Sequence, residues 1–271
     1  MSGTLAHLGV TGPDAEQIRE FLSRLEGDGI ETVRFVFSDQ HGILRGKALT
    51  ASAAESACRN GVTAPSSILL KDSSHRTVFP VWEGDVGFGP GVMTGAGDIL
   101  MVPDLSTYRP LPWSRHSAWV LCDVVQSNGA AIPFAPRTVL RDALDRLHGR
   151  GIEMICGLEV EFHVFRPTEP GLAHDGGGMP GAAPATAPLT QGYQLLSETS
   201  YSMVEDLLDD LRRTAQAMGL PVRSTEVELG PSQFEFTFDP AAAWLHADNM
   251  VLFRALAKEV CARRGLLASF M

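Results

Sequence analysis

The sequence has few cysteines, no long uninterrupted apolar run and no excess of basic residues. Its four cysteines lie far apart and form no CxxC pair, so reduced thiols are expected in place of a disulfide framework or a zinc site. The longest apolar stretches are interrupted well before 18 residues, so no membrane span is predicted. The first ten residues lack a basic start followed by a long apolar run, the mark of an export signal. We therefore expect a cytoplasmic protein.

Acidic residues outnumber basic ones by 32 to 22, which gives a formal net charge of −10. A surface of this sign repels phosphate backbones, so nucleic acid is not an expected partner. Hydrophobic residues at 44% and charged residues at 20% are typical of globular proteins and exclude a mostly disordered chain. A length of 271 residues suits one large domain or two of ordinary size.

The first 130 residues predict a small unit rich in strands. An amphipathic helix is indicated before Gly27, and residues 31–37 then alternate between polar and apolar with a period of two. Residues 38–49 complete a hairpin pattern. Residues 66–97 are dense in glycine, proline and serine and predict a long ordered loop. Two more strands are predicted, over 98–103 and 118–125.

The rest of the chain alternates between helices and strands, which predicts an α+β fold. Helices are predicted over 136–149, 203–218 and 241–264, strands over 153–165, 222–229, 233–238 and 266–271, and a surface loop over 167–192. The last strand is apolar and no turn or polar tail follows Met271. Because natural domains cover such edges, we expect the chain to be a fragment of a longer polypeptide.

Two groups of carboxylates alternate with apolar residues in the predicted strands. Glu159 and Glu161 share one face of a strand, because residues i and i+2 point to the same side. Glu226 and Glu228, and then Glu235 after a Gly-Pro turn, repeat the pattern. If the two runs pair as neighbouring strands, several carboxylates face a common cavity, and Mg²⁺ or Mn²⁺ prefers such oxygen ligands. A sheet with one solvated face would show the same alternation, so the residues alone leave both interpretations open.

Several motifs occur in the order found in glutamine synthetases, and together they resemble that family over most of the chain. They are Asp39-Gln40-His41-Gly42 with Arg45-Gly46-Lys47, Gly97-Asp98 with Pro103-Asp104 and Leu111-Pro112-Trp113, Pro136-Arg137, Gly157-x-Glu159-x-Glu161-Phe162, Glu228-x-Gly-Pro-x-Gln233-x-Glu235, Ala247-Asp248 and Phe270-Met271. The resemblance implies an N-terminal helix over 1–29 and a β-grasp domain over 30–130. It implies that residues 131–271 form the N-terminal portion of a truncated catalytic domain, with a curved antiparallel sheet and flanking helices.

The resemblance also implies an activity, with ATP as a substrate and a divalent cation, Mg²⁺ or Mn²⁺. In this family ATP phosphorylates the γ-carboxylate of glutamate, and ammonia displaces the phosphate to give the amide. By resemblance, Glu161, Glu228 and Glu235 would hold one cation beside glutamate, and Glu159 would help hold a second near the ATP phosphates. The resemblance further implies a homo-oligomer built from stacked rings.

Asp72, followed by two serines, loosely matches the family's loop whose aspartate reaches the ammonium site of the adjacent subunit. As a catalytic residue it would favour binding and deprotonation of ammonium, whereas aspartate and serine are also ordinary turn residues. The family's glycine after this aspartate is missing here, and so are the paired histidines that often precede the residue at Glu228. These departures indicate a divergent branch whose amine is ammonia by default, or else methylamine, a polyamine or another amine.

The family's later motifs, which supply a histidine ligand, arginines and a flap, do not occur in the 271 residues. We therefore predict that the isolated chain does not make glutamine. The first functional hypothesis is a ligase acting on glutamate, ATP and an amine. Its alternatives are a truncated or non-catalytic subunit that acts as an oligomer or interaction module, and a different metal-dependent phosphoryl-transfer enzyme.

Overall fold

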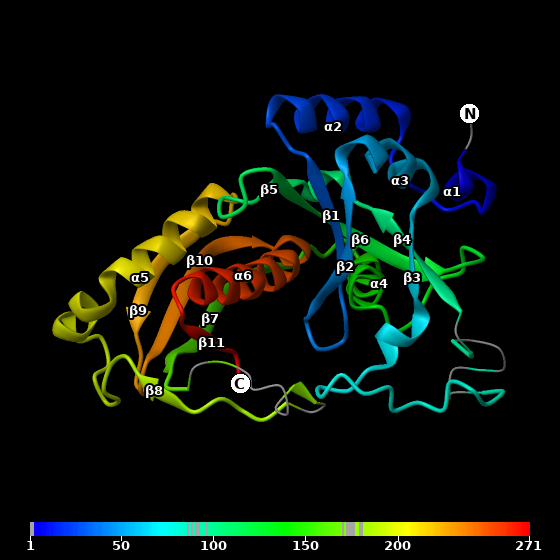
Figure 1. Cartoon of the computed structure of the whole chain (residues 1–271). Helices are drawn as coiled ribbons and strands as arrows, with labels where there is room; N and C mark the ends of the chain where they lie inside the picture. Colours follow the sequence, from blue (N-terminus) through cyan, green and yellow to red (C-terminus); the bar gives the residue numbers. More distant parts are fainter. Residues whose placement is uncertain are drawn as a thin grey trace. The chain divides into compact units, whose positions relative to one another are not determined.

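The computed structural model describes residues 3–85, 87, 89, 93–95, 97–169, 171, 177–178 and 181–271. Its chain forms two compact units, Met1–Ala143 and Leu144–Met271, coloured along the sequence in Figure 1. Both units combine helices with a sheet, so the α+β expectation holds. In the described part of the chain, no helix has both the length and the apolar character that a membrane span requires.

The first unit is built around a mixed sheet. In its described residues the strand order is β2-β1-β6-β4-β3, with β5 paired to β6. β1 and β6 run parallel, and the other pairs are antiparallel. The elements are α1 (Thr4–His7), α2 (Ala15–Gly27), β1 (Thr32–Ser38), β2 (Leu44–Thr50), η1 (Ala51–Ala53), α3 (Ala54–Asn60), β3 (Val62–Pro65), η2 (Ser66–Leu70), β4 (Asp98–Pro103), η3 (Leu105–Thr107), β5 (Arg109–Pro110), β6 (Ser117–Gln126) and α4 (Pro136–His148).

Helix α2 begins where its capping residues place it. The side chain of Asp14 accepts hydrogen bonds from the backbone of Glu16 and Gln17, and the Gln17 side chain accepts one from the Asp14 backbone. The apolar face of α2, with Ile18 and Phe21, is buried in the core of this unit. The predicted helix, hairpin and strands of this unit are confirmed, while α1, α3, β3 and β5 were not predicted.

The hairpin between β1 and β2 is held by a buried aspartate. Asp39 is 1% exposed, and its carboxylate accepts hydrogen bonds from the backbone N–H groups of His41 and Ile43 and forms an ion pair with Arg45 Nε at 2.8 Å. Gly46 lies so close to the neighbouring strand that a Cβ atom there would come within 1.9 Å of the Phe35 carbonyl oxygen. The hairpin geometry therefore explains why the sequence has an aspartate at position 39 and a glycine at position 46, one in each of the two motifs at this hairpin.

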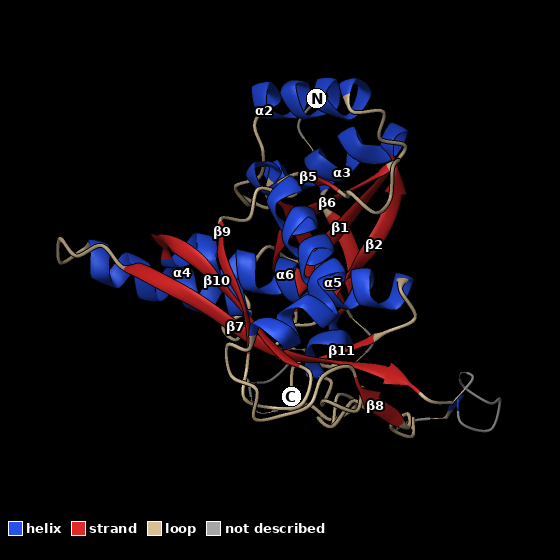
Figure 2. Cartoon of the chain, turned by 90° about the vertical axis from the view of Figure 1, so that its left-hand side faces the viewer, coloured by secondary structure: helices blue, strands red, loops and turns tan. Residues whose placement is uncertain are grey.

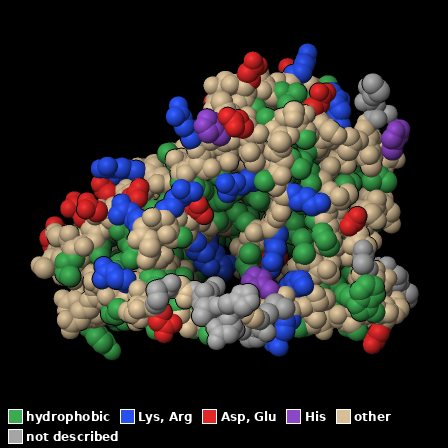
Figure 3. All heavy atoms as spheres, viewed as in Figure 1, with side chains coloured by type: hydrophobic (Ala, Val, Ile, Leu, Met, Phe, Trp, Pro, Cys, Tyr) green, Lys and Arg blue, Asp and Glu red, His purple; other side chains and the backbone are tan. Residues whose placement is uncertain are grey.

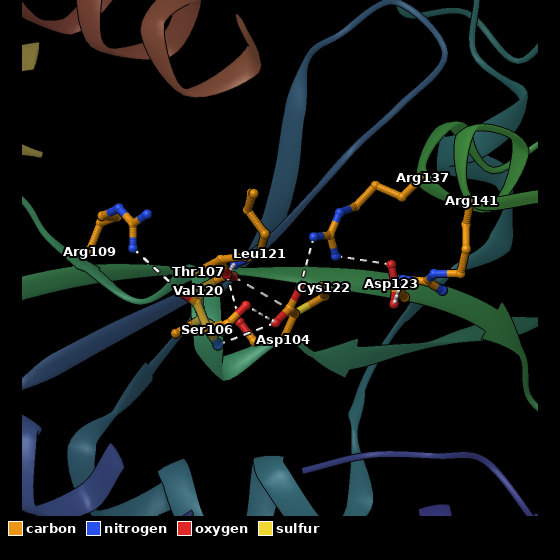
Figure 4. A network of polar contacts seen from close by, with 10 residues as sticks. All are labelled: Asp104, Ser106, Thr107, Arg109, Val120, Leu121, Cys122, Asp123, Arg137 and Arg141. Carbon is orange, nitrogen blue, oxygen red and sulfur yellow. Dashed lines mark hydrogen bonds and ion pairs between the residues drawn. The ribbon is translucent and has the colours of Figure 1, made fainter. Parts of the chain in front are cut away.

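Ion pairs bind the first turns of α4 to the sheet of the first unit. Arg137 contacts Asp104 at 2.8 Å and Asp123 at 3.0 Å, and Arg141 contacts Asp123 at 2.7 Å, as Figure 4 shows. These contacts hold the start of α4 in the first unit, which explains why the compact units divide inside this helix. The predicted domain boundary after residue 130 and the β-grasp assignment stay predictions.

The second unit contains an antiparallel sheet with the order β11-β7-β10-β9 and with β8 paired to β7, among the described residues. Figure 2 shows β7, β10 and β9 side by side. Acidic and basic side chains are intermixed over α5 in Figure 3. Within this helix, Asp209 forms ion pairs with Arg212 and Arg213. The elements are β7 (Ile155–Pro167), β8 (Thr186–Pro188), α5 (Glu198–Ala217), β9 (Val222–Val227), β10 (Gln233–Ala242), α6 (Ala243–Arg263) and β11 (Leu267–Ser269).

One face of this sheet packs against the helices. Phe162 of β7 and Phe236 of β10 are almost completely buried, and both rings contact Phe253 of α6 at centroid distances of 5.7 and 5.0 Å. Because side chains alternate along a strand, this packing leaves the glutamates of β7 and β10 on the opposite face. The apolar residues of the alternating pattern in β7 and β10 thus form the face of the sheet that packs into the core.

Several predicted boundaries in the second unit were wrong. The helix predicted over 203–218 begins earlier, at Glu198, because Ser197 caps its first turn by accepting a hydrogen bond from the Ser200 backbone. The strand predicted over 222–229 ends at Val227, and the one over 266–271 spans only Leu267–Ser269. The predicted loop over 167–192 contains β8, and parts of both predicted long loops lie outside the described residues.

Candidate metal centre

Three glutamates form a row across the sheet of the second unit. Strand pairing places Glu235 of β10 directly opposite Glu161 of β7 on one side and Glu226 of β9 on the other. Directly opposite residues of antiparallel strands have Cβ atoms about 5 Å apart, so like charges in these positions repel one another. The register thus concentrates negative charge on one face.

Two members of this row, Glu226 and Glu235, form a tight group with a further glutamate, Glu228. One carboxylate oxygen from each lies within 4.8 Å of the other two. Glu228 lies just beyond the end of β9, in the turn that leads to β10. Three carboxylates at this spacing form an oxygen-only donor set, which suits a hard divalent cation such as Mg²⁺ or Mn²⁺. The residues therefore fit the predicted metal.

The charge around Glu235 changes its titration. The pKa of Glu235 is raised to about 7, first by partial burial and then by the neighbouring carboxylates of Glu226, Glu228, Glu159 and Glu161. In the described part of the chain no hydrogen bond is donated to Glu235, so a proton or a cation at this carboxylate would relieve the repulsion. A dication bound here would take the place of that proton.

The other carboxylates of the row have donors. Ser224 Oγ donates to Glu226 Oε1 at 2.7 Å, and the side-chain amide of Gln233 donates to Glu161 Oε2. Hydrogen bonds to an ionised carboxylate favour its charged form. Glu235 has no such donor among the described residues.

Four of the five predicted site residues lie in this unit, and their role as metal ligands stays a prediction. Glu228 and Glu235 belong to the tight group, and Glu161 is paired directly with Glu235. Glu159 lies one step along β7, opposite Thr237. Glu226 was noted in the sequence but was not predicted as a ligand. The signal was its alternation with Glu228, but its place opposite Glu235 depends on the pairing of β9 with β10.

Asp72 lies in the first unit, in a turn that its own side chain stabilises. Its Oδ1 atom accepts hydrogen bonds from the backbone of Ser74 and Arg76, each at 2.9 Å, and its Oδ2 atom lies 3.4 Å from Arg76 Nε. The backbone hydrogen bond from Arg76 is the largest of the effects that lower the pKa of Asp72. The carboxylate thus has the structural role of a turn residue, and its catalytic role stays a prediction.

A cavity of about 390 Å³ lies beside the carboxylates of the second unit. Glu159, Glu226 and Thr237 line it, and Arg223 is the one basic residue of its lining. The cavity borders the glutamate row at its Glu226 end, so a molecule bound in it would contact Glu226 and Glu159.

The raised pKa of Glu235 predicts a pH-dependent stability. A carboxyl group whose pKa is higher in the folded than in the unfolded chain stabilises the fold fully at low pH, and this contribution is lost as the pH rises through about 7. In the metal-free chain at pH 8, Glu235→Gln removes the destabilising effect of the ionised Glu235 carboxylate. Because water screens this partly exposed group, we expect a gain of about 1 kcal/mol, or roughly 2–4 °C in Tm.

The measurement is thermal unfolding followed by circular dichroism at pH 5 and pH 8, in the presence of a chelator. The matched control is Glu259→Gln, which removes one charge from α6, where Glu259 pairs with Arg263 at 3.0 Å. A Tm at pH 8 that is equal in wild type and Glu235→Gln would contradict the assignment of the raised pKa to Glu235.

The sequence comparisons with known proteins indicate one family. A family model described as the glutamine synthetase catalytic domain matches residues 133–271. Gamma-glutamylanilide synthase of an Acinetobacter species is 32% identical over 256 residues, which are 92% of this chain and 51% of that protein. Gamma-glutamylethanolamide synthetase of Streptomyces coelicolor is 30% identical over 94% of this chain and 53% of its own length.

A solved structure named "GmaS/ADP complex-Conformation 1" matches with a TM-score of 0.71 and 27% identity. The match covers 93% of this chain and 51% of that one. The chain therefore spans about half the length of the relatives that it matches.

Proposed function

Because the chain belongs to the glutamine synthetase family, we propose that the protein carrying it joins an amine to the γ-carboxylate of glutamate, using ATP and a divalent cation, Mg²⁺ or Mn²⁺. In this reaction ATP transfers its γ-phosphoryl group to the glutamate side chain, giving γ-glutamyl phosphate and ADP. The amine then attacks the activated carbonyl carbon, loses a proton and releases inorganic phosphate. The observation that carries the proposal is the group formed by Glu226, Glu228 and Glu235.

The chain's own carboxylates would bind the cation. Glu226, Glu228 and Glu235 supply three oxygens within reach of one ion, and Glu161 stands directly opposite Glu235. Glu159, which lines the neighbouring cavity, would contribute to a second cation site. A cation at these carboxylates supplies positive charge that offsets the negative charges of glutamate and ATP.

Proton transfer at Glu235 is part of this proposal. With a pKa raised to about 7, Glu235 is partly protonated at neutral pH in the metal-free chain, and it would release that proton when a cation binds. At and below neutral pH, the site would then carry more negative charge in the metal-bound form than in the metal-free form. This coupling would lower the affinity for the cation as the pH falls below 7.

We propose that the acceptor is an organic primary amine. Ammonia, the default acceptor in the sequence analysis, is the alternative. By their names, relatives form γ-glutamylanilide and γ-glutamylethanolamide or use isopropylamine. These names support an organic amine, as does the absence of paired histidines before Glu228. A homo-oligomer of stacked rings is proposed on the family resemblance.

The test of this function is phosphate release across a panel of amines. We expect the gene product that carries these residues to release phosphate from ATP only when glutamate and a suitable amine are both present. The isolated 271-residue chain is expected to release none above background under the same conditions. Release that is independent of the amine, or equal with other carboxylic acids in place of glutamate, would reject the proposed reaction.

A further inference from the structure

Gln233 occupies a junction between the turn that carries Glu228 and the glutamate row. It is the first residue of β10 and is paired with His163 of β7. Its side chain lies on the same face as that of Glu235, two residues along the strand. Gln233 is therefore a neutral, hydrogen-bonding residue beside a strongly acidic row.

The structure determines which way the Gln233 amide points. Its Oε1 atom accepts a hydrogen bond from the Gly230 backbone N–H at 2.8 Å, so this end of the amide must be the oxygen. The Nε2 end then donates to Glu161 Oε2. Gly230 permits the contact, because a Cβ atom there would lie 2.5 Å from Gln233 Oε1.

The turn that orients Gln233 is itself fixed to the sheet. Nδ1 of the His163 ring donates a hydrogen bond to the Pro231 carbonyl oxygen at 3.0 Å. The Val164 backbone N–H donates one to the Ser232 carbonyl oxygen, also at 3.0 Å. Ser232 is completely buried, and its hydroxyl accepts hydrogen bonds from the backbone of Leu189 and Thr190. The orientation of the Gln233 amide thus depends on a rigid turn and not on a mobile side chain.

We propose that Gln233 is a positioning residue that holds the Glu161 carboxylate ready for a divalent cation. Without a donor, repulsion from Glu235 would turn the Glu161 side chain toward solvent, where its rotamers are free. The Gln233 amide engages one oxygen of Glu161 and holds this carboxylate on the sheet face that carries Glu235. The bond links Glu161 to the same turn that carries Glu228, so ligands from β7 and from the turn are ordered together. This inference rests on the proposed function, because the cation site is part of it.

The experiment is a double-mutant cycle on the affinity of the 271-residue chain for Mn²⁺, measured by electron paramagnetic resonance. Gln233→Met keeps the length of the side chain and removes both hydrogen bonds. Residues that orient metal ligands typically contribute about 10–100-fold in affinity, and we expect a loss in that range. In a Glu161→Gln background, Gln233→Met should cause a much smaller further loss than in wild type, because most of its effect passes through Glu161.

The matched control is Gln216→Met, which changes an exposed glutamine of α5 that bonds to Arg212 and should leave Mn²⁺ affinity unchanged. Thermal unfolding of each metal-free variant checks that the fold survives. If the effects of Gln233→Met and Glu161→Gln add, or if Gln233→Met binds Mn²⁺ as wild type does, the inference is overturned while the proposed function stands.

A second measurement needs no metal. In the NMR spectrum, the side-chain amide protons of Gln233 should shift in Glu161→Gln and stay unchanged in Glu259→Gln. An unshifted Gln233 amide overturns the inference. A shifted amide in a chain that binds no Mn²⁺ supports the bond to Glu161 and overturns the proposed cation site.

Discussion

Replacing Glu235 by glutamine is expected to weaken Mn²⁺ binding to the chain by at least about 100-fold. Glu235 is the central member of the row, opposite both Glu161 and Glu226, and belongs to the tight group with Glu228. Its loss removes a negatively charged ligand from the middle of the site. This should exceed the 10–100-fold effect typical of residues that only orient a ligand. Glutamine has the same shape, so the change tests charge and ligation separately from packing.

The measurement is Mn²⁺ titration by electron paramagnetic resonance at pH 8, with Glu259→Gln as the control for loss of one negative charge. Glu259 lies on α6, which packs on the opposite face of the sheet, so its loss should change the affinity little. The wild-type affinity should also fall by up to about tenfold per pH unit below pH 7, because a proton competes with the cation at Glu235. If the Mn²⁺ affinity of Glu235→Gln is within about threefold of the wild-type affinity, the proposed metal centre is wrong, because so small an effect excludes Glu235 as a direct ligand.

Asp39→Ala is expected to destabilise the first unit by about 3–5 kcal/mol, the usual effect of removing one partner from a buried ion pair. The Asp39 side chain is 1% exposed and that of Arg45 19% exposed, so water can replace the lost contact only in part. The change also leaves the backbone N–H groups of His41 and Ile43 without their acceptor. Asp39→Asn should cost less, because its amide oxygen can still accept these two hydrogen bonds.

The free energy of unfolding is measured by urea denaturation of wild type and variants. Glu55→Ala is the control: Glu55 is exposed and pairs with Arg59 at 3.0 Å, so its removal should cost below about 1 kcal/mol. Equal losses for Asp39→Ala and Glu55→Ala would show that the hairpin does not depend on the buried pair.

The two carboxylate groups could be found in the sequence because strand periodicity is a local property. Glu159 and Glu161 alternate with Val160 and Phe162, and the structure buries both apolar residues as the pattern predicts. The end of β9 could not be found in the same way. The alternation continues through Glu228, but pairing with β10 ends at Val227, and Glu228 reaches the group from the turn.

Asp72 illustrates a different limit. Its sequence context allowed both a turn residue and a catalytic carboxylate, and the structure shows the turn in full through the contacts with Ser74 and Arg76. These contacts are local, and a sequence pattern of aspartate and serine is compatible with them. A catalytic role depends on which other groups surround the carboxylate, and residue types alone do not specify that.

The sequence by itself determined the apolar and acidic faces of the strands, the position of the first hairpin and the kind of ligand atom available, because each depends on residue type and short-range spacing. Only the tertiary structure decided that Glu226 stands opposite Glu235, that Gln233 bonds to Glu161 and that Glu235 carries the raised pKa. These features arise from strand register between segments far apart in the chain. Register depends on how all the strands pack together, and no single segment contains that information.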